Sequence, residues 1–342
     1  MPTTKRTWRG AQATSWAVGA SILLALVFWP SVGIHALWNV LIPVVPALLA
    51  LAPGLWRNVC PLGSTALLPR HARASSRREL STAWQGRLSL IGLALLFTLV
   101  PLRHVVLDAS GPATALTICA MGAVAFTVGL VFEWKSGWCS GLCPVHPVER
   151  LYGSAPLVRV TNAHCSACHR CVDACPDSMV DPSRLNKRQG WARQLADTVL
   201  AGGFAGFVWG WFQVPDYHGD GWSHLSAAYG WPLAGAAVSL TAYSGLSRMV
   251  PQHRRRWLVR SFAALAIGCY YWYRLPMLLG FGEFPGDGVL IDLTGVLPAW
   301  APIASRIATS LAGLVWLVRL DPVRRTWTVR PPLVPIRAAP PS

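Results

Sequence analysis

Long apolar stretches alternate with short polar or basic segments along most of the 342-residue chain. Each stretch has about the 20 residues that a helix needs to cross the hydrocarbon core of a bilayer. Eight stretches are expected to form transmembrane helices, at residues 16–34, 38–56, 88–106, 113–133, 196–214, 225–245, 260–280 and 296–318. The pattern therefore predicts an all-α polytopic membrane protein.

Three prolines interrupt the first two stretches, namely Pro30, Pro43 and Pro46. Because proline kinks or ends a helix, these stretches form either two crossings or one re-entrant hairpin. Basic residues precede the first apolar run, as they do in a signal peptide, but no small-residue cleavage site follows. We therefore expect an uncleaved first span.

Basic residues gather on alternate connecting segments, as the positive-inside rule requires of a polytopic membrane protein. The N-terminal residues carry three, and segments 57–87, 134–195 and 246–260 carry six, eight and five. The intervening segments hold only Arg103 and Arg274, together with six acidic residues. Both termini are therefore predicted to be cytoplasmic.

Composition and net charge agree with a membrane location. The chain is 53% hydrophobic and 13% charged, with a mean hydropathy of +0.40, and it contains 18 Trp, a residue that concentrates at lipid headgroups. Its 30 Lys and Arg exceed its 14 Asp and Glu, which gives a net charge of +16. Because this excess follows the predicted topology, we expect membrane lipid as the partner of the basic segments and no nucleic acid.

The spans divide the chain into four regions. Residues 1–133 hold spans one to four, residues 134–195 form the one sizeable extramembrane segment, residues 196–319 hold spans five to eight, and residues 320–342 form a Pro-rich tail. Residues 134–195 lie on the cytoplasmic side in this topology, and we expect the chemistry there.

A ferredoxin-type cysteine run lies inside this segment. Its spacing is C-x2-C-x2-C-x3-C-P, formed by Cys165, Cys168, Cys171, Cys175 and Pro176. This is the bacterial ferredoxin pattern for a 4Fe-4S cluster. A zinc knuckle that uses His164 or His169 is the alternative, but zinc requires neither a third Cys at the same interval nor the terminal Cys-Pro. The run predicts a small ferredoxin-like insert with one 4Fe-4S cluster.

The ligand count points to a second site. In two-cluster ferredoxins the fourth Cys of such a run binds the other cluster, so Cys175 is expected there or back at the first cluster. Further cysteines at predicted cytoplasmic helix ends are Cys60, Cys139 and Cys143. The seven cysteines fill seven of eight cluster positions, and the candidates for the last position are His146, His164, His169 or a non-protein ligand. For Cys119 and Cys269, inside apolar stretches, we expect ordinary packing.

At these positions the sequence resembles the NapH/NosR-type membrane-bound iron-sulfur proteins, a polyferredoxin-like family associated with nitrate and nitrous oxide respiration. Its members combine several transmembrane helices, two C-x3-C-P motifs at cytoplasmic helix ends and ferredoxin-type 4Fe-4S motifs. Here the second C-x3-C-P motif is intact as Cys139, Cys143 and Pro144, whereas Trp56 stands in place of the first Cys of the other motif, before Cys60 and Pro61. The resemblance is best over residues 56–176.

The resemblance implies electron transfer at the cytoplasmic face of a bacterial inner membrane, from quinol or a soluble donor. The implied partners are a redox protein, as donor or acceptor, and a quinone. The chain would serve a reductase or a quinone-linked respiratory system as an electron-transfer component rather than as a stand-alone enzyme. Two alternatives are a maturation or regulatory protein that uses the same cluster, and a transporter with a structural zinc knuckle.

Other polar residues near or inside the predicted spans carry weaker signals. Four histidines lie near the predicted outer face, but no pair has the spacing typical of haem ligands within spans; they are His35, His104, His218 and His224. Arg306 is a cation inside a predicted span, where a paired or functional role is the default. Its nearest acidic loop residue, Asp292, is roughly four helical turns away, so the sequence identifies no partner for it.

Overall fold

The computed structural model describes residues 2–78, 80–133, 135–153, 156–158, 160, 190–217 and 221–316. Its elements are all helical, and an isolated bridge joins Arg78 and Phe132. The elements in chain order are α1 (Pro2–Phe28), α2 (Pro30–Ile34), η1 (His35–Leu41), α3 (Ile42–Leu51), α4 (Pro53–Val59), α5 (Pro61–His71), α6 (Thr82–Leu102), η2 (Arg103–Leu107), α7 (Gly111–Val131), η3 (Lys135–Leu142), α8 (His146–Tyr152), α10 (Trp191–Trp211), η5 (Gly221–His224), α11 (Leu225–Met249), η6 (Gln252–Arg254), α12 (Arg255–Leu278) and α13 (Ala301–Leu314).

Four helical segments among the described residues are long and apolar enough to cross a membrane. They cover Arg6–Phe28, Pro30–Leu51, Ala83–Leu107 and Gly111–Val131, and they correspond to the first four predicted spans. The first two have 23 and 22 residues, lengths that favour two crossings over one re-entrant hairpin. The all-helical class and the membrane character are thus confirmed.

The second half of the chain is helical but does not confirm the other four spans. Helices α10 to α13 coincide with the predicted stretches, yet none of them meets both the length and the apolarity of a span within the described residues. The total of eight spans stays a prediction.

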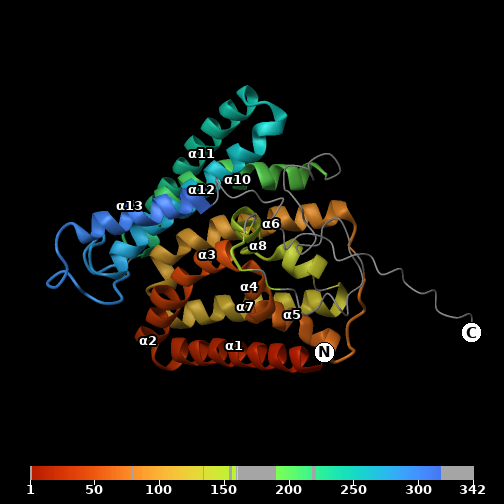
Figure 1. Cartoon of the computed structure of the whole chain (residues 1–342). Helices are drawn as coiled ribbons and strands as arrows, with labels where there is room; N and C mark the ends of the chain where they lie inside the picture. Colours follow the sequence, from red (N-terminus) through yellow and green to blue (C-terminus); the bar gives the residue numbers. More distant parts are fainter. Residues whose placement is uncertain are drawn as a thin grey trace, which may run out of the picture.

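Figure 1 shows α1, α7 and α6 running lengthwise, with α10 packed against α6 and with α11 and α12 packed against α10. The close contact of α10 with α11 depends on glycine. A Cβ at Gly206 would collide with the carbonyl of Gly235, and a Cβ at Gly235 would collide with the carbonyl of Gly206. In a membrane, where lipid is as apolar as the side chains, such close backbone packing holds helices together.

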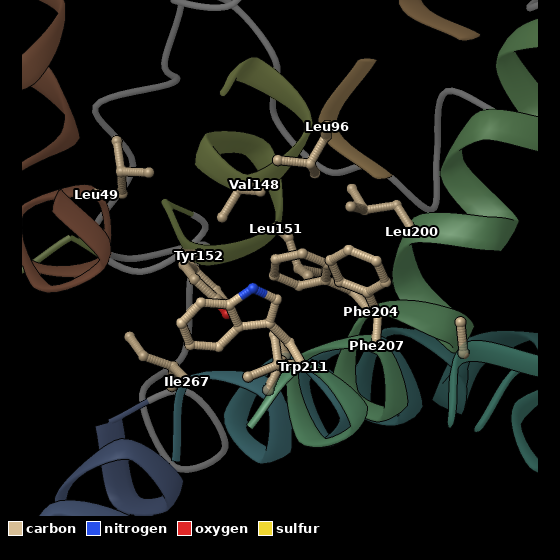
Figure 2. Close-up of a cluster of buried hydrophobic side chains, with 14 of the residues drawn as sticks. Leu49, Leu96, Val148, Leu151, Tyr152, Leu200, Phe204, Phe207, Trp211 and Ile267 are labelled. Carbon is tan, nitrogen blue, oxygen red and sulfur yellow. The ribbon is translucent and has the colours of Figure 1, made fainter. Parts of the chain in front are cut away.

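The largest hydrophobic cluster fixes α8 within the helical body. Val148, Leu151 and Tyr152 of α8 lie between the side chains of α6 and the aromatic rings of α10, and Figure 2 shows this arrangement. The rings of Phe204 and Phe207 stack with centroids 6.1 Å apart. Because α8 begins three residues after Cys143, this packing also fixes the turn that contains Cys143.

Candidate metal centre

The ferredoxin run lies outside the residues that the structure describes. This holds for Cys165, Cys168, Cys171 and Cys175, and also for His164 and His169. Their assignment to a 4Fe-4S cluster stays a prediction.

The described residues on both sides of that segment are attached to the helical body. The backbone N–H groups of Leu157 and Val158 both donate to the carbonyl of Leu51, at 2.8 and 2.9 Å. At the other end, the Cβ of Arg193 in α10 lies 3.2 Å from the position of a Cβ built on Gly86 in α6. The described residues before the segment therefore contact the end of α3, and those after it contact the start of α6.

Cys60 occupies a sharp corner between α4 and α5. Its extended ψ of 120° suits a residue that precedes proline, and Pro61 starts α5 at the position where its missing N–H costs nothing. The backbone N–H groups of Gly63 and Leu62 lie close to the Cys60 sulfur and favour its anionic form. The local sequence thus aims free N–H groups at a thiol.

Cys143 occupies a corner of the same design between η3 and α8. Pro144 follows it, and the backbone N–H groups of Val145 and His146 favour the anionic form of its sulfur. Each Cys-Pro pair therefore places its sulfur beside the N–H groups two and three residues later. Cys139 belongs to η3, one helical turn before Cys143.

The two corners lie together. The sulfurs of Cys60 and Cys139 are 3.8 and 3.9 Å from the position that a Cβ on Gly63 would take. Cys143 is near enough to Cys60 that a thiolate at Cys60 raises the pKa of Cys143. The structure thus brings together the three cysteines that the sequence proposed for a second site, and their role as ligands stays a prediction.

All three cysteines are half-buried. Cys139 and Cys143 pack against a cluster that includes Trp138, which is 1% exposed. Burial raises the pKa of Cys60 to about 11 and that of Cys143 to about 12. Both thiols therefore keep their protons at neutral pH. A bound metal ion or cluster would displace these protons and release them to solvent.

These sulfurs do not form a single-ion site. Among the described residues, no three His, Cys, Asp or Glu side chains converge closely enough to hold one metal ion. A structural zinc ion needs four ligand atoms at 2.0–2.3 Å from one point.

A buried ionic network surrounds the two corners. Arg57 pairs with Glu149, and Arg150 binds both oxygens of Asp197 at 2.7 and 3.2 Å. Arg193 lies 3.5 Å from the same Asp197. Among the described residues, this network thus contains three arginines and two carboxylates. The sequence alone does not reveal the network, because its members come from separate helices.

His146 is buried at the centre of these arginines. It is 2% exposed, and neither ring nitrogen has a hydrogen-bond partner among the described residues. Burial, followed by the charges of Arg193, Arg150 and Arg57, lowers its pKa well below the ordinary histidine value. The ring is therefore neutral at pH 7, the form that can bind a metal.

A second buried polar cluster lies at the far end of α6, about 14 residues or ~20 Å from Ser89, a partner of Arg193. His104 places Nδ1 2.6 Å from Asp216 and Nε2 3.1 Å from the carbonyl of Trp211. Both partners are hydrogen-bond acceptors, so the ring of His104 is held between the Asp216 carboxylate and the Trp211 carbonyl.

Two arginines complete this second cluster. The Arg103 guanidinium lies 3.5 Å from Asp216 and sits over the rings of Trp38 and Trp211, each 5.1 Å away. Arg274 donates to the carbonyl of Trp38 at 2.6 Å. The sequence analysis placed Arg103 and Arg274 in the segments between spans and found no partner for His104. In the structure all three side chains are buried in one cluster.

The structure gives a partner to Arg306, for which the sequence identified none. Its Nη2 lies 3.4 Å from Glu283, and its Nε donates to the carbonyl of Trp272 at 3.2 Å. Asp292 is nearer along the chain, but chain distance does not decide the pairing. Of the cysteines expected to serve packing, Cys269 packs against the main core and Cys119 is exposed on α7.

Comparisons of the chain with protein-family models, curated proteins and solved structures found no match.

Proposed function

We propose that this protein is a membrane-bound iron-sulfur protein that passes electrons at the inner face of a bacterial cytoplasmic membrane. The observation that carries the proposal is the convergence of Cys60, Cys139 and Cys143 from two Cys-Pro corners. These corners lie at the end of the helical body that holds both ends of the segment with the ferredoxin run.

The donor set fits a 4Fe-4S cluster better than a single ion. A cube binds its ligands at four corners, and these lie farther apart than the ligands of one zinc ion. In the ferredoxin run, the third Cys at a two-residue interval and the terminal Cys-Pro also favour a cluster, because a zinc site requires neither.

In this proposal the run provides one site through Cys165, Cys168 and Cys171. Cys175 joins either that site or the second one with Cys60, Cys139 and Cys143. Such clusters take up and release one electron at a time, with a potential set by charge, hydrogen bonds and solvent exposure.

The described residues would hold the second site dry and oriented. Cys139 and Cys143 pack against the cluster that contains Trp138, and the packing of α8 fixes the corner at Cys143. The backbone N–H groups beside Cys60 and Cys143 favour the thiolates that bind iron.

The topology that the charges predict determines on which side of the membrane the electrons would pass. The basic segments around the cysteines would face the cytoplasm, with both termini on that side. A redox protein would then meet the clusters there, and a quinone would meet the chain within the membrane. Because thiolates would occupy the iron sites, the chain serves as a carrier of electrons.

A cysteine substitution in the run tests this function. Cys168→Ser is expected to remove the iron-sulfur absorption of the first cluster and to leave membrane insertion intact, because the membrane helices do not depend on that segment. The measurement is the visible absorption and iron content of anaerobically purified protein. Cys119→Ala, on the exposed face of α7, is the matched control and should change neither. An unchanged iron content in Cys168→Ser would refute the assignment.

A further inference from the structure

When Cys175 completes the first cluster, the second site has three cysteines for four cluster positions. The identity of its fourth ligand is a question that rests on the proposed function. The two corners show where that ligand is missing. Cys139 stands four residues before Cys143, whereas Trp56 stands four residues before Cys60. Trp56 packs against the largest hydrophobic cluster and has no group that binds iron.

We propose that a ring nitrogen of His146 is the fourth ligand of the cluster held by Cys60, Cys139 and Cys143. Histidine replaces cysteine on iron in Rieske centres, so the chemistry has a precedent in another cluster type.

The state of the His146 side chain supports this assignment. The ring is 2% exposed, and both nitrogens lack a hydrogen-bond partner among the described residues. Buried polar atoms in native proteins are nearly always paired, so an unpaired group calls for an explanation such as an ion or a bound group. A neutral imidazole with a free lone pair is the form that an iron atom requires.

The position of His146 supports it as well. The residue begins α8, and its own N–H lies close to the Cys143 sulfur. Val148, Leu151 and Tyr152 hold α8 in the core, so the backbone of His146 is fixed beside Cys143.

Neighbouring groups indicate an anionic occupant. The Ser140 hydroxyl and Nη2 of Arg193 are also buried without a hydrogen-bond partner in the described part of the chain. Ser140 lies between Cys139 and Cys143, and Arg193 donates to its carbonyl at 3.3 Å. Free donors and the nearby arginines disfavour a bare divalent cation. They suit a cluster, whose thiolates and sulfides carry negative charge.

A nitrogen ligand has two consequences. A neutral imidazole in place of a thiolate removes one negative charge from the cluster, and the arginines act in the same direction. The second cluster should therefore have a higher reduction potential than the first. An electron that enters at the first cluster would move toward the second.

Pulsed EPR on the reduced, anaerobically purified full-length protein tests the proposal. A Cys168→Ser background removes the first cluster, so the remaining signal belongs to the second. We expect a strong hyperfine coupling from one histidine nitrogen, which should change when the protein is labelled with 15N-histidine. The coupling should be absent in His146→Cys, which should keep the iron and have a lower reduction potential. His253→Ala, at an exposed position, is the control and should preserve the coupling.

The unsubstituted His146 protein gives an answer even if His146→Cys does not fold. Two results overturn the proposal while the proposed function stands: an iron-containing second site without a histidine coupling, and a coupling that survives in His146→Cys but is lost when His164 or His169 is replaced. A protein without iron at either site overturns both.

Discussion

Individual residues at the two corners explain why cysteine and proline occur together. Proline favours an extended conformation of the preceding residue, and Pro61 also starts α5 without needing its own N–H. Cys60 and Cys143 each place a sulfur beside the two backbone N–H groups that follow the proline. Buried thiols with such high pKa values are stable and unreactive until iron replaces the proton.

At this scale we predict the effect of removing one sulfur from the second site. Cys60→Ala should lower the iron content by about one cluster, roughly four iron atoms per chain, because the corner at Cys143 supplies too few ligands alone. Iron analysis of anaerobically purified protein measures this. Cys269→Ala removes a buried thiol from the core side of α12 and should leave the iron unchanged. A full iron content in Cys60→Ala would limit the protein to the cluster of the ferredoxin run.

The contribution of sequence is clearest at these residues. The repeated Cys-Pro pair marked Cys60 and Cys143 as candidates, because local chemistry can be read from neighbouring residues. Their surroundings could not be read in that way. Arg57 and Glu149 are 92 residues apart in the chain, and no local pattern signals that they pair.

Among the elements, α6 with η2 connects the two polar clusters of the molecule. Ser89, near its start, accepts a hydrogen bond from Arg193 at 2.8 Å, and Arg103 and His104 at its other end bind Asp216. Asp216 follows α10, so this second cluster joins the outer ends of two helices. Burial alone would raise the pKa of Asp216, but Arg103 and His104 more than offset it and hold that pKa below the ordinary range.

Asp216→Asn should therefore destabilise the protein at pH 7 by about 3 kcal/mol, because it removes the buried carboxylate that binds the Arg103 guanidinium and the His104 ring. Because the folded-state pKa of Asp216 is lower than the unfolded value of about 3.9, its contribution is present above that pH and is lost as the pH falls through the folded-state value. Thermal unfolding in detergent should thus show a wide gap between the two proteins at pH 7 and a narrower gap below about pH 4. Asp292→Asn, at an exposed loop position, should stay within about 0.5 kcal/mol of the parent protein. An equal stability of Asp216→Asn and the parent at pH 7 would count against the network.

The elements also show how far apolar patterns extend. The predicted spans 88–106 and 113–133 agree with the segments Ala83–Leu107 and Gly111–Val131, since apolar length alone defines them. The span predicted for 38–56 is shifted, and its segment covers Pro30–Leu51 instead. Ala52, with φ −145° and ψ 60°, ends α3 before Pro53. The apolar stretch continues past this point, so the hydrophobic pattern alone does not predict where the helix ends.

The whole molecule has two chemically distinct ends. The cysteines, His146 and the arginines lie at the end where the undescribed segment is attached, and Asp216 with its partners lies at the other. The number of spans in the second half was harder to predict, because glycine-mediated packing as well as lipid contact determines helices such as α10 and α11.

The central claim is that the cysteines hold iron and inorganic sulfide, and the most direct test is their stoichiometry in anaerobically purified, full-length protein, with EPR on the same sample. We predict at least four iron atoms and four acid-labile sulfides per chain, about eight of each with both sites filled, and the EPR signal of a reduced 4Fe-4S cluster. Colourless protein that contains zinc, or no metal, and lacks acid-labile sulfide would contradict the account.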